Sequence, residues 1–177
     1  MRKFPALILS MGLIAVSAGA YAGDGHKSDA SVTAGVKSAL TSNDSTKARQ
    51  INVETKDGVV QLSGFVDSTD AKAAAETTAL NVEGVKTVQN KLLIRDPNRS
   101  TGQAVDDTVI TAKVKGEIAG KAGLGTASDV NVEVNSGVVE LSGFVSTPDE
   151  KAKAAEVARN INGVKDVHNN ISLKPAG

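Results

Sequence analysis

Residues 58–66 read GVVQLSGFV and residues 137–145 read GVVELSGFV, so nine residues recur with a single change, Gln61 to Glu140. The chain has only three Phe, and two of them lie in these segments, each directly after a glycine. The doubled segment therefore decides how the rest of the chain is divided.

The repeat extends well beyond these nine residues. Residues 51–94 align with residues 130–173 at a constant spacing of 79 positions, and residues 33–37 match residues 111–115 at a spacing of 78. The second copy thus has one extra residue before its first strand. Each unit of ~67 residues has enough elements to close a core of its own, which predicts two tandem domains rather than a solenoid.

The start of the chain predicts export. Arg2 and Lys3 precede an apolar run over residues 6–18 and the sequence Ala20-Tyr21-Ala22, the pattern of a cleavable signal peptide. A membrane anchor is the alternative, but the run is shorter than the ~20 residues that a spanning helix needs. We expect a periplasmic monomer with no transmembrane segment after cleavage. The expected organisation is signal peptide 1–22, flexible start 23–28, domain 29–95, linker 96–106, domain 107–174 and tail 175–177.

The composition excludes several kinds of site and partner. Cysteine is absent, so there is no disulfide framework and no thiolate metal site. Without Arg2 and Lys3 the chain has two more acidic than basic residues, which gives no bulk attraction to nucleic acid. The mature chain keeps two aromatic residues, Phe65 and Phe144, so its cores must be aliphatic.

The order of elements within a unit follows from its periodicity. Apolar residues at every fourth position predict an amphipathic helix, and alternating residues from 51 and from 130 predict a strand. Gly58 and Gly137 each close a two-residue hairpin turn before the quoted segment, which is the returning strand. A second, Ala-rich helix and a last strand complete the unit. The predicted fold class is α+β: two tandem two-layer sandwiches, each helix–strand–strand–helix–strand, with a three-stranded mixed sheet and both helices on one face.

The second helices carry start and stop signals. Thr147, Pro148 and Glu150 fit an N-cap, a first-turn proline and a capping box, and Ser68 starts the first copy's helix less fully. Gly84 and Gly163, each followed by Val, are expected to be C′ glycines of Schellman caps.

The quoted strand has two different faces. One face, expected to meet the helices, contains Gly64 or Gly143, whose missing side chain lets an Ala-faced helix approach. The other face is expected to be open and polar, with an exposed aromatic residue. Its candidate contact residues are Gln61, Phe65, Glu140 and Phe144. Packing between the domains, or burial under a linker, is the alternative for both aromatic residues.

Each unit contains the pattern V-x-x-x-[DS]-G-V-V-x-L-S-G-x-V, followed by an Ala-rich helix and then by G-V-x-x-V-x-N-x-[LI]. This combination resembles the BON domain family. It occurs over residues 53–66 with 84–92, and again over 132–145 with 163–171. The family glycines fall on Gly64, Gly84, Gly143 and Gly163. The resemblance implies a non-enzymatic envelope protein linked to phospholipid contact or to osmotic stress and periplasmic chaperoning, with exported client proteins or envelope proteins as partners. The charges of the second helices are mixed, unlike the basic surface helix of lipid-binding members.

The sequence gives little support for catalytic, metal-binding or phosphate-binding residues. Ser63 and Ser142 lack a nucleophile elbow and a recurring histidine. His26 and His168 are unmatched between the copies, and two histidines without Cys do not make a zinc site. Asp149 and Glu150 suit the first turn of a helix better than acid–base catalysis. Residues 23–25 and 124–126 lack the setting of a phosphate loop. We expect no enzymatic activity, metal or cofactor; His168 with Asp166 is the arrangement that would revive an enzymatic hypothesis.

Asn90 and Asn169 form the remaining polar pair, because alternation places them on the covered face of the last strand. We expect structural asparagines that bond nearby backbone groups, or a bulge at each position; ligand binding is the alternative.

Overall fold

The structure, a computed structural model, describes residues 27–46, 51–121 and 130–174. Several predicted features lie outside these ranges: the signal peptide, His26, the segments 23–25 and 124–126, the extra residue before the second copy's first strand, and the tail 175–177. In the described part of the chain, no helix is long and apolar enough to cross a membrane.

Two domains follow one another with the same order of elements. The first domain contains α1 (Asp29–Ser42), β1 (Ile51–Lys56), β2 (Val59–Val66), α2 (Thr69–Leu80), β3 (Thr87–Asn90) and β4 (Leu93–Ile94). The second contains α3 (Thr101–Gly120), β5 (Val130–Asn135), β6 (Val138–Val145), α4 (Pro148–Arg159), β7 (Asp166–Asn169) and β8 (Ser172–Leu173). The predicted α+β fold class is confirmed.

The quoted segment is the central strand of each sheet. β2 pairs antiparallel with β1 and parallel with β3 and β4, and β6 has the same neighbours in the second domain. The predicted last strand is interrupted after Asn90 and after Asn169, so it pairs with the central strand in two short pieces. The parallel pairing follows from the helix that crosses over between the two strands.

Each domain has its own apolar core between its sheet and its helices. In the first domain Val36, Leu40 and Leu62 are completely buried against Ala75 of α2. In the second domain the corresponding positions are filled by Val114, Ile118, Leu141 and Ala154. Burying one such Leu or Ile side chain contributes roughly 1.5–3 kcal/mol. The cores do not merge, so each domain is packed independently of the other.

The hairpin turns have the predicted glycines. Asp57 and Gly58 have φ values of 53° and 79°, and Ser136 and Gly137 have φ values of 52° and 82°. Two consecutive positive φ values are the signature of a type I′ turn, whose twist matches that of the flanking strands.

The helix starts are confirmed, but the helix ends differ from the prediction. Thr147 caps α4 in a capping box with Glu150, and Ser68 caps α2. However, α2 ends at Leu80, so Gly84 lies four residues further on, in a separate turn. The Schellman prediction for Gly84 and Gly163 is wrong, because the chain first makes tight turns such as that from Val82 N–H to the Ala79 carbonyl.

The predicted linker contains the start of a helix. α3 begins at Thr101, inside the predicted linker 96–106, because Ser100 and Gln103 form a complete capping box. Only residues 95–100 separate β4 from α3.

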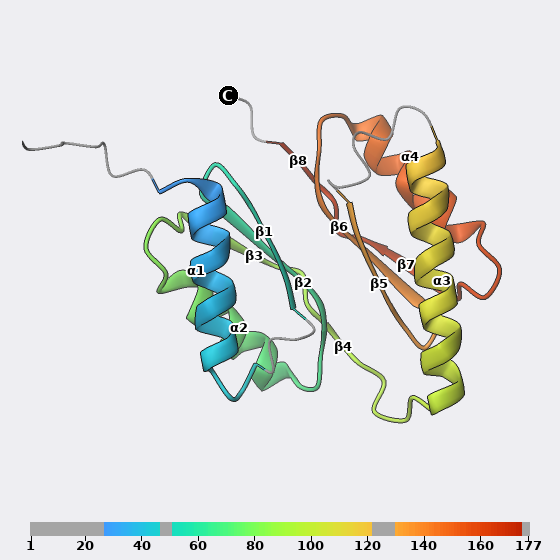
Figure 1. Cartoon of the computed structure of the whole chain (residues 1–177), viewed down its shortest axis with the longest axis horizontal. Coiled ribbons are helices and arrows are strands. Elements are labelled where there is room, and N and C mark those ends of the chain that lie inside the picture. Colours follow the sequence, from blue (N-terminus) through green and yellow to red (C-terminus); the bar gives the residue numbers. More distant parts are fainter. Residues whose placement is uncertain (1–26, 47–50, 122–129, 175–177) are drawn as a thin grey trace, which may run out of the picture.

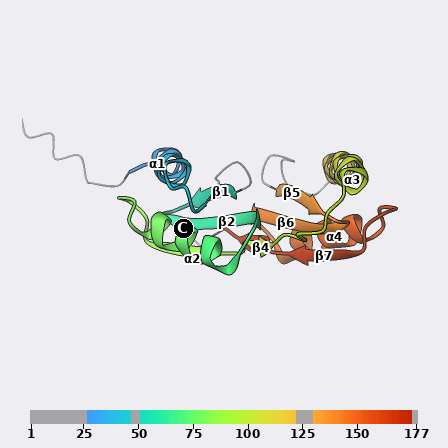
Figure 2. The same ribbon diagram turned by 90° about the horizontal axis from the view of Figure 1, so that it is seen from below.

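The two sheets face each other across the middle of the molecule. In Figure 1, α1 and α2 lie on one outer side, α3 and α4 on the other, and the strands between them. Figure 2 shows the central strands β2 and β6 side by side at the junction. The sheet face that carries no helix in one domain is therefore covered by the same face of the other domain.

Candidate functional site

The candidate contact residues lie in the contact between the two sheets, which we call the inter-sheet contact. It is formed by Gln61, Ser63 and Phe65 of β2 and by Glu140, Ser142 and Phe144 of β6. Gln61 and Glu140 are 1% exposed and both Phe side chains are 7% exposed. The expectation of an open face with exposed aromatics is therefore wrong: strand alternation selects the face correctly, but the other domain covers it.

An approximate two-fold axis passes through the contact between Ser63 and Ser142. Their hydroxyl oxygens lie 2.7 Å apart, although the residues are equivalent in the two copies. Because equivalent residues meet, some interactions on one side have a counterpart on the other. Neither serine has a histidine as its hydrogen-bond partner in the described part of the chain, so a nucleophile role has no support.

Gln61 and Glu140 perform the same task on the two sides of this axis. The amide Oε1 of Gln61 accepts from the Gly143 backbone N–H at 2.6 Å, and the carboxylate Oε2 of Glu140 accepts from the Gly64 N–H at 2.6 Å. Each central strand thus holds a backbone group of the other.

The two glycines have a role that the sequence analysis did not predict. Gly64 and Gly143 have φ values of 111° and 115°, a region that residues with a side chain rarely adopt. Their N–H groups point across the inter-sheet contact to Gln61 and Glu140. The backbone conformation and the buried N–H bond across the contact each favour glycine at these positions.

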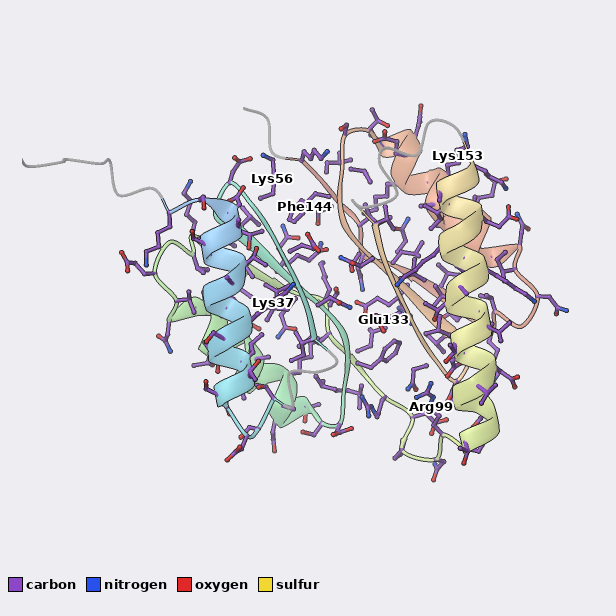
Figure 3. The ribbon with its side chains drawn as sticks, in the orientation of Figure 1. Lys37, Lys56, Arg99, Glu133, Phe144 and Lys153 are labelled. Carbon is purple, nitrogen blue, oxygen red and sulfur yellow. The ribbon has the colours of Figure 1, made fainter. Side chains whose placement is uncertain are left out.

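The ends of the contact are also polar. Asn52 donates to Glu133 at 3.0 Å, and Asn131 donates to Glu54 at 2.9 Å, so this pair follows the approximate symmetry. Figure 3 shows Glu133 and Phe144 in the space between the two sheets.

A third group of hydrogen bonds breaks the symmetry. The amide nitrogen of Gln61 donates to the Asn170 carbonyl and to Ser172 Oγ, both at 2.9 Å. Ser172 in turn donates to Gln89 at 2.8 Å. Asn170 donates to Glu140 Oε1 at 3.0 Å. Almost every buried polar atom of the contact therefore has a partner, which removes most of the cost of burying it.

The two aromatic side chains belong to the contact and not to the cores. Neither Phe65 nor Phe144 is part of the apolar cluster of its own domain. Phe65 lines a cavity of about 190 Å³ together with Arg95 and Arg99 of the linker and Asn135 of β5. The inter-domain packing that was the alternative to an exposed anchor is what the structure shows for Phe65.

Glu140 is electrostatically unusual. Burial raises the pKa of its carboxyl to about 7, although hydrogen bonds from Asn170 and the Gly64 N–H favour the charged form. The neighbouring charge of Glu133, which lies opposite Glu140 in the β5–β6 pairing, raises the pKa further, and Lys72 lowers it. The contact therefore contains a group that changes charge near neutral pH.

The BON domain model matches residues 28–96 and residues 106–175. The chain belongs to the BON domain family. Its two BON domains are the two structural domains described above.

The chain is similar to two named proteins. It is 36% identical over 147 residues to the Osmotically-inducible protein Y of Escherichia coli, covering 82% of this chain and 73% of that protein. It is 36% identical over 118 residues to the Outer membrane lipoprotein DolP of Haemophilus influenzae, covering 67% of this chain and 60% of that protein.

Among solved structures, the C-terminal domain of CdsD, a structural protein of the type III secretion system of Chlamydia trachomatis, is 18% identical. Its TM-score is 0.34 over 84% of this chain and 68% of that chain, too low to support an inference.

Asn90 and Asn169 hold the helix of each BON domain to its last strand. Asn90 donates to the Lys72 carbonyl at 2.8 Å, and Asn169 donates to the Lys151 carbonyl at 2.7 Å. The side-chain oxygen of Asn90 accepts from the Leu92 N–H at 3.3 Å, where the last strand is interrupted. These are the backbone contacts expected of structural asparagines.

His168 and Asp166 do come together on β7, at 3.4 Å, but both side chains are largely exposed. Among the described residues, no group of three or more His, Asp or Glu side chains could hold a metal ion.

The sequence analysis missed one repeated feature, an aspartate at the same repeat position of α1 and α3. Asp29 accepts from the N–H groups of Asp57 and Gly58, and Asp107 accepts from those of Ser136 and Gly137, at 2.8–3.0 Å. Burial alone would raise the pKa of Asp29, but these two hydrogen bonds lower it below its usual value. The signal was available, because the two aspartates lie 78 positions apart, the spacing of the first helices.

Asp107 has an additional partner from the linker. The Arg99 Nε–H donates to Asp107 at 2.8 Å, and Asp107 is 2% exposed. This ion pair holds Arg99 of the linker against the second BON domain. Asp96 is also tied to that domain, because its backbone N–H donates to Asn135 at 3.1 Å.

Proposed function

We propose that this chain is a non-enzymatic periplasmic protein of the osmotic-stress type, which binds exported client proteins with the faces of the inter-sheet contact when its two BON domains separate. Family membership and the similarity to the Osmotically-inducible protein Y support the stress role. The predicted signal peptide supports the location.

The observation that carries the proposal is the composition of the inter-sheet contact. It joins two domains whose apolar cores are separate, and it consists largely of hydrogen-bonded polar groups around two Phe side chains. Contacts of this polar kind between domains favour relative motion. Separation would leave both cores intact and expose Phe65 and Phe144, which are suited to contact unfolded segments.

A disulfide across the approximate two-fold axis tests this proposal. Ser63 and Ser142 place their Oγ atoms 2.7 Å apart, and the chain contains no Cys, so Ser63→Cys with Ser142→Cys gives a single possible bridge. Oxidation would lock the domains together. We expect the wild type and the reduced double variant to suppress heat-induced aggregation of citrate synthase, and the oxidised variant to lose most of that suppression.

The reduced double variant is the matched control, because it differs from the locked form by one covalent bond. Equal suppression by the oxidised and reduced forms would show that clients do not use these faces. Absence of suppression by the wild type would remove the client-binding function itself.

Docking on phospholipid surfaces is the second candidate function. One relative is an outer membrane lipoprotein, and Val105 and Val109 of α3 are 62% and 46% exposed, one helical turn apart. Lys113 and Lys115 of the same helix are offset by Asp106 and Glu117, so the contact would rest on apolar insertion rather than on charge.

Vesicle flotation tests this candidate. We expect binding to anionic phosphatidylglycerol vesicles that changes little between low and moderate salt and is lost in Val105→Ser with Val109→Ser. The double variant Val105→Ala with Val109→Ala should keep part of it. Absence of wild-type binding at both salt concentrations would exclude the lipid function.

A further inference from the structure

The two halves of the inter-sheet contact use different chemistry for the same task. Gln61 holds the Gly143 N–H with a neutral amide, whereas Glu140 holds the Gly64 N–H with a titratable carboxyl, at the same distance of 2.6 Å. Both side chains are 1% exposed. At the positions of Gln61 and Glu140, the charge therefore depends on one side of the approximate two-fold axis.

In the described part of the chain, the donors that meet the Glu140 carboxyl are uncharged. They are the Gly64 backbone N–H and the Asn170 amide. Glu140 also lies between Glu133 of β5 and His168 of β7 in the sheet pairing. An ionised Glu140 thus has a like charge beside it and no hydrogen-bonded cation.

Other charged groups around Glu140 come from each element packed near it. They are Glu133 on β5, Asp166 and His168 on β7, Glu54 on β1, Lys72 on α2 and Lys91 before β4. Glu54 accepts from Asn131 across the contact, and the Lys91 carbonyl faces Asn170 at 3.5 Å. The charge of Lys72 favours an ionised Glu140 and lowers its pKa.

We propose that the inter-sheet contact is a proton-operated clasp: a protonated Glu140 keeps the two BON domains closed, and ionisation of Glu140 lets them separate. A neutral carboxyl still offers an oxygen to the Gly64 N–H. Glu133 lies opposite Glu140 in the β5–β6 pairing, at an ordinary cross-strand Cβ spacing of about 5 Å, so a neutral Glu140 avoids repulsion between two carboxylates. The ionised form keeps the hydrogen bonds but adds a buried, uncompensated charge.

The direction of the effect follows from linkage. Burial raises the pKa of Glu140 to about 7 in the closed form, against 4.5 for an exposed glutamate. The closed form therefore binds the proton more tightly, and closure weakens as the pH rises through 7. Between about pH 5.5 and pH 8.5 the ratio of separated to closed molecules is expected to increase roughly thirtyfold.

The pH-dependent closure concerns the motion of the two BON domains. Its consequence for client proteins rests on the proposed function. If that function holds, alkaline conditions would expose the client-binding faces and acidic conditions would cover them. Measuring the motion without any client keeps the two proposals separate.

The experiment uses the full chain with a spin label on each outer helix. Lys37 of α1 and Lys115 of α3 are exposed and equivalent, and the absence of Cys allows Lys37→Cys and Lys115→Cys to be labelled specifically. The distance between the two labels is measured by pulsed electron–electron double resonance at pH 5.5 and pH 8.5. We expect one narrow distance distribution at pH 5.5 and a longer, broader population at pH 8.5.

The chain supplies its own control variants. Glu140→Gln copies the first domain's Gln61 and should give the narrow distribution at both pH values. His168→Gln copies Gln89 at the same repeat position, and it should still open at pH 8.5. In the protein without spin labels, the carbon-13 chemical shift of the Glu140 carboxyl should titrate with a midpoint near pH 7.

Each outcome has a definite meaning. A distribution that does not change with pH in the wild type, opening of Glu140→Gln equal to that of the wild type, or loss of opening in His168→Gln would overturn the clasp. None of these results depends on client binding. A failure of the locked variant to alter client binding would instead remove the proposed function and leave the clasp standing.

Discussion

Ser63 and Ser142 donate and accept one hydrogen bond between them at 2.7 Å, although they are the same residue of two successive BON domains. Equivalent residues can meet in this way only near a two-fold axis. The duplicated sequence thus pairs with itself inside one chain, and two of its kinds of polar contact occur twice.

Replacing Glu140 by Gln should remove a pH dependence of stability. The pKa of Glu140 in the folded protein, about 7, lies above the value of 4.5 for a free glutamate. The contribution of this group is present below pH 4.5 and is lost as the pH rises through 7. We expect the free energy of unfolding to fall by about 2.5 kcal/mol between pH 5 and pH 8 in the wild type. Urea unfolding at both pH values should show a much smaller change in the variant.

The reciprocal substitution Gln61→Glu should instead increase the pH dependence of stability. It places a second carboxyl at the Gly143 N–H and opposite Glu54, and it removes the donors to Asn170 and Ser172. We expect a loss of about 2–4 kcal/mol at pH 8 that is partly recovered at pH 5. Thermal unfolding followed by circular dichroism at both pH values measures this loss of stability. Equal losses at the two pH values would mean that the charge is not the cause.

Gly64→Ala should destabilise the protein through its backbone. The φ of 111° at this position is strained for any residue with a Cβ, and a shift of the backbone would also move the N–H away from Glu140. The expected cost is about 1–3 kcal/mol in urea unfolding.

Gly116→Ala is the matched control for that substitution. Gly116 lies within α3, and a Cβ there would meet nothing within 4 Å. This variant should be stabilised by about 0.5–1 kcal/mol. Destabilisation by both changes to a similar degree would contradict the special role of the Gly64 conformation.

Asp107→Asn should cost more than Asp29→Asn, although both aspartates hold a hairpin turn. Asp107 also accepts from Arg99 and is 2% exposed, so the change leaves a guanidinium without its carboxylate. We expect losses of about 3 kcal/mol for Asp107 and about 1 kcal/mol for Asp29. Hydrogen exchange of the Gly137 and Gly58 amides locates the loss in the corresponding domain.

The fold of each domain could be predicted from the sequence because its signals are local. Four-residue spacing at Val32, Val36 and Leu40 gives the first helix, and the turn at Gly58 needs only neighbouring residues. Errors arose where two local signals competed. Gly84 looks like a helix cap, but the chain turns after Leu80, and residues 101–106 look like linker although Ser100 starts a helix there.

The sequence by itself determined the duplication, the order of elements and which side chains share a strand face, since these depend on periodicity along the chain. Tertiary structure alone decided what covers that face. Alternation places Gln61, Phe65, Glu140 and Phe144 opposite the helices, but it carries no information about residues 79 positions away. The burial of these four side chains, and the raised pKa of Glu140, arise because a short linker brings two copies of one sheet face together.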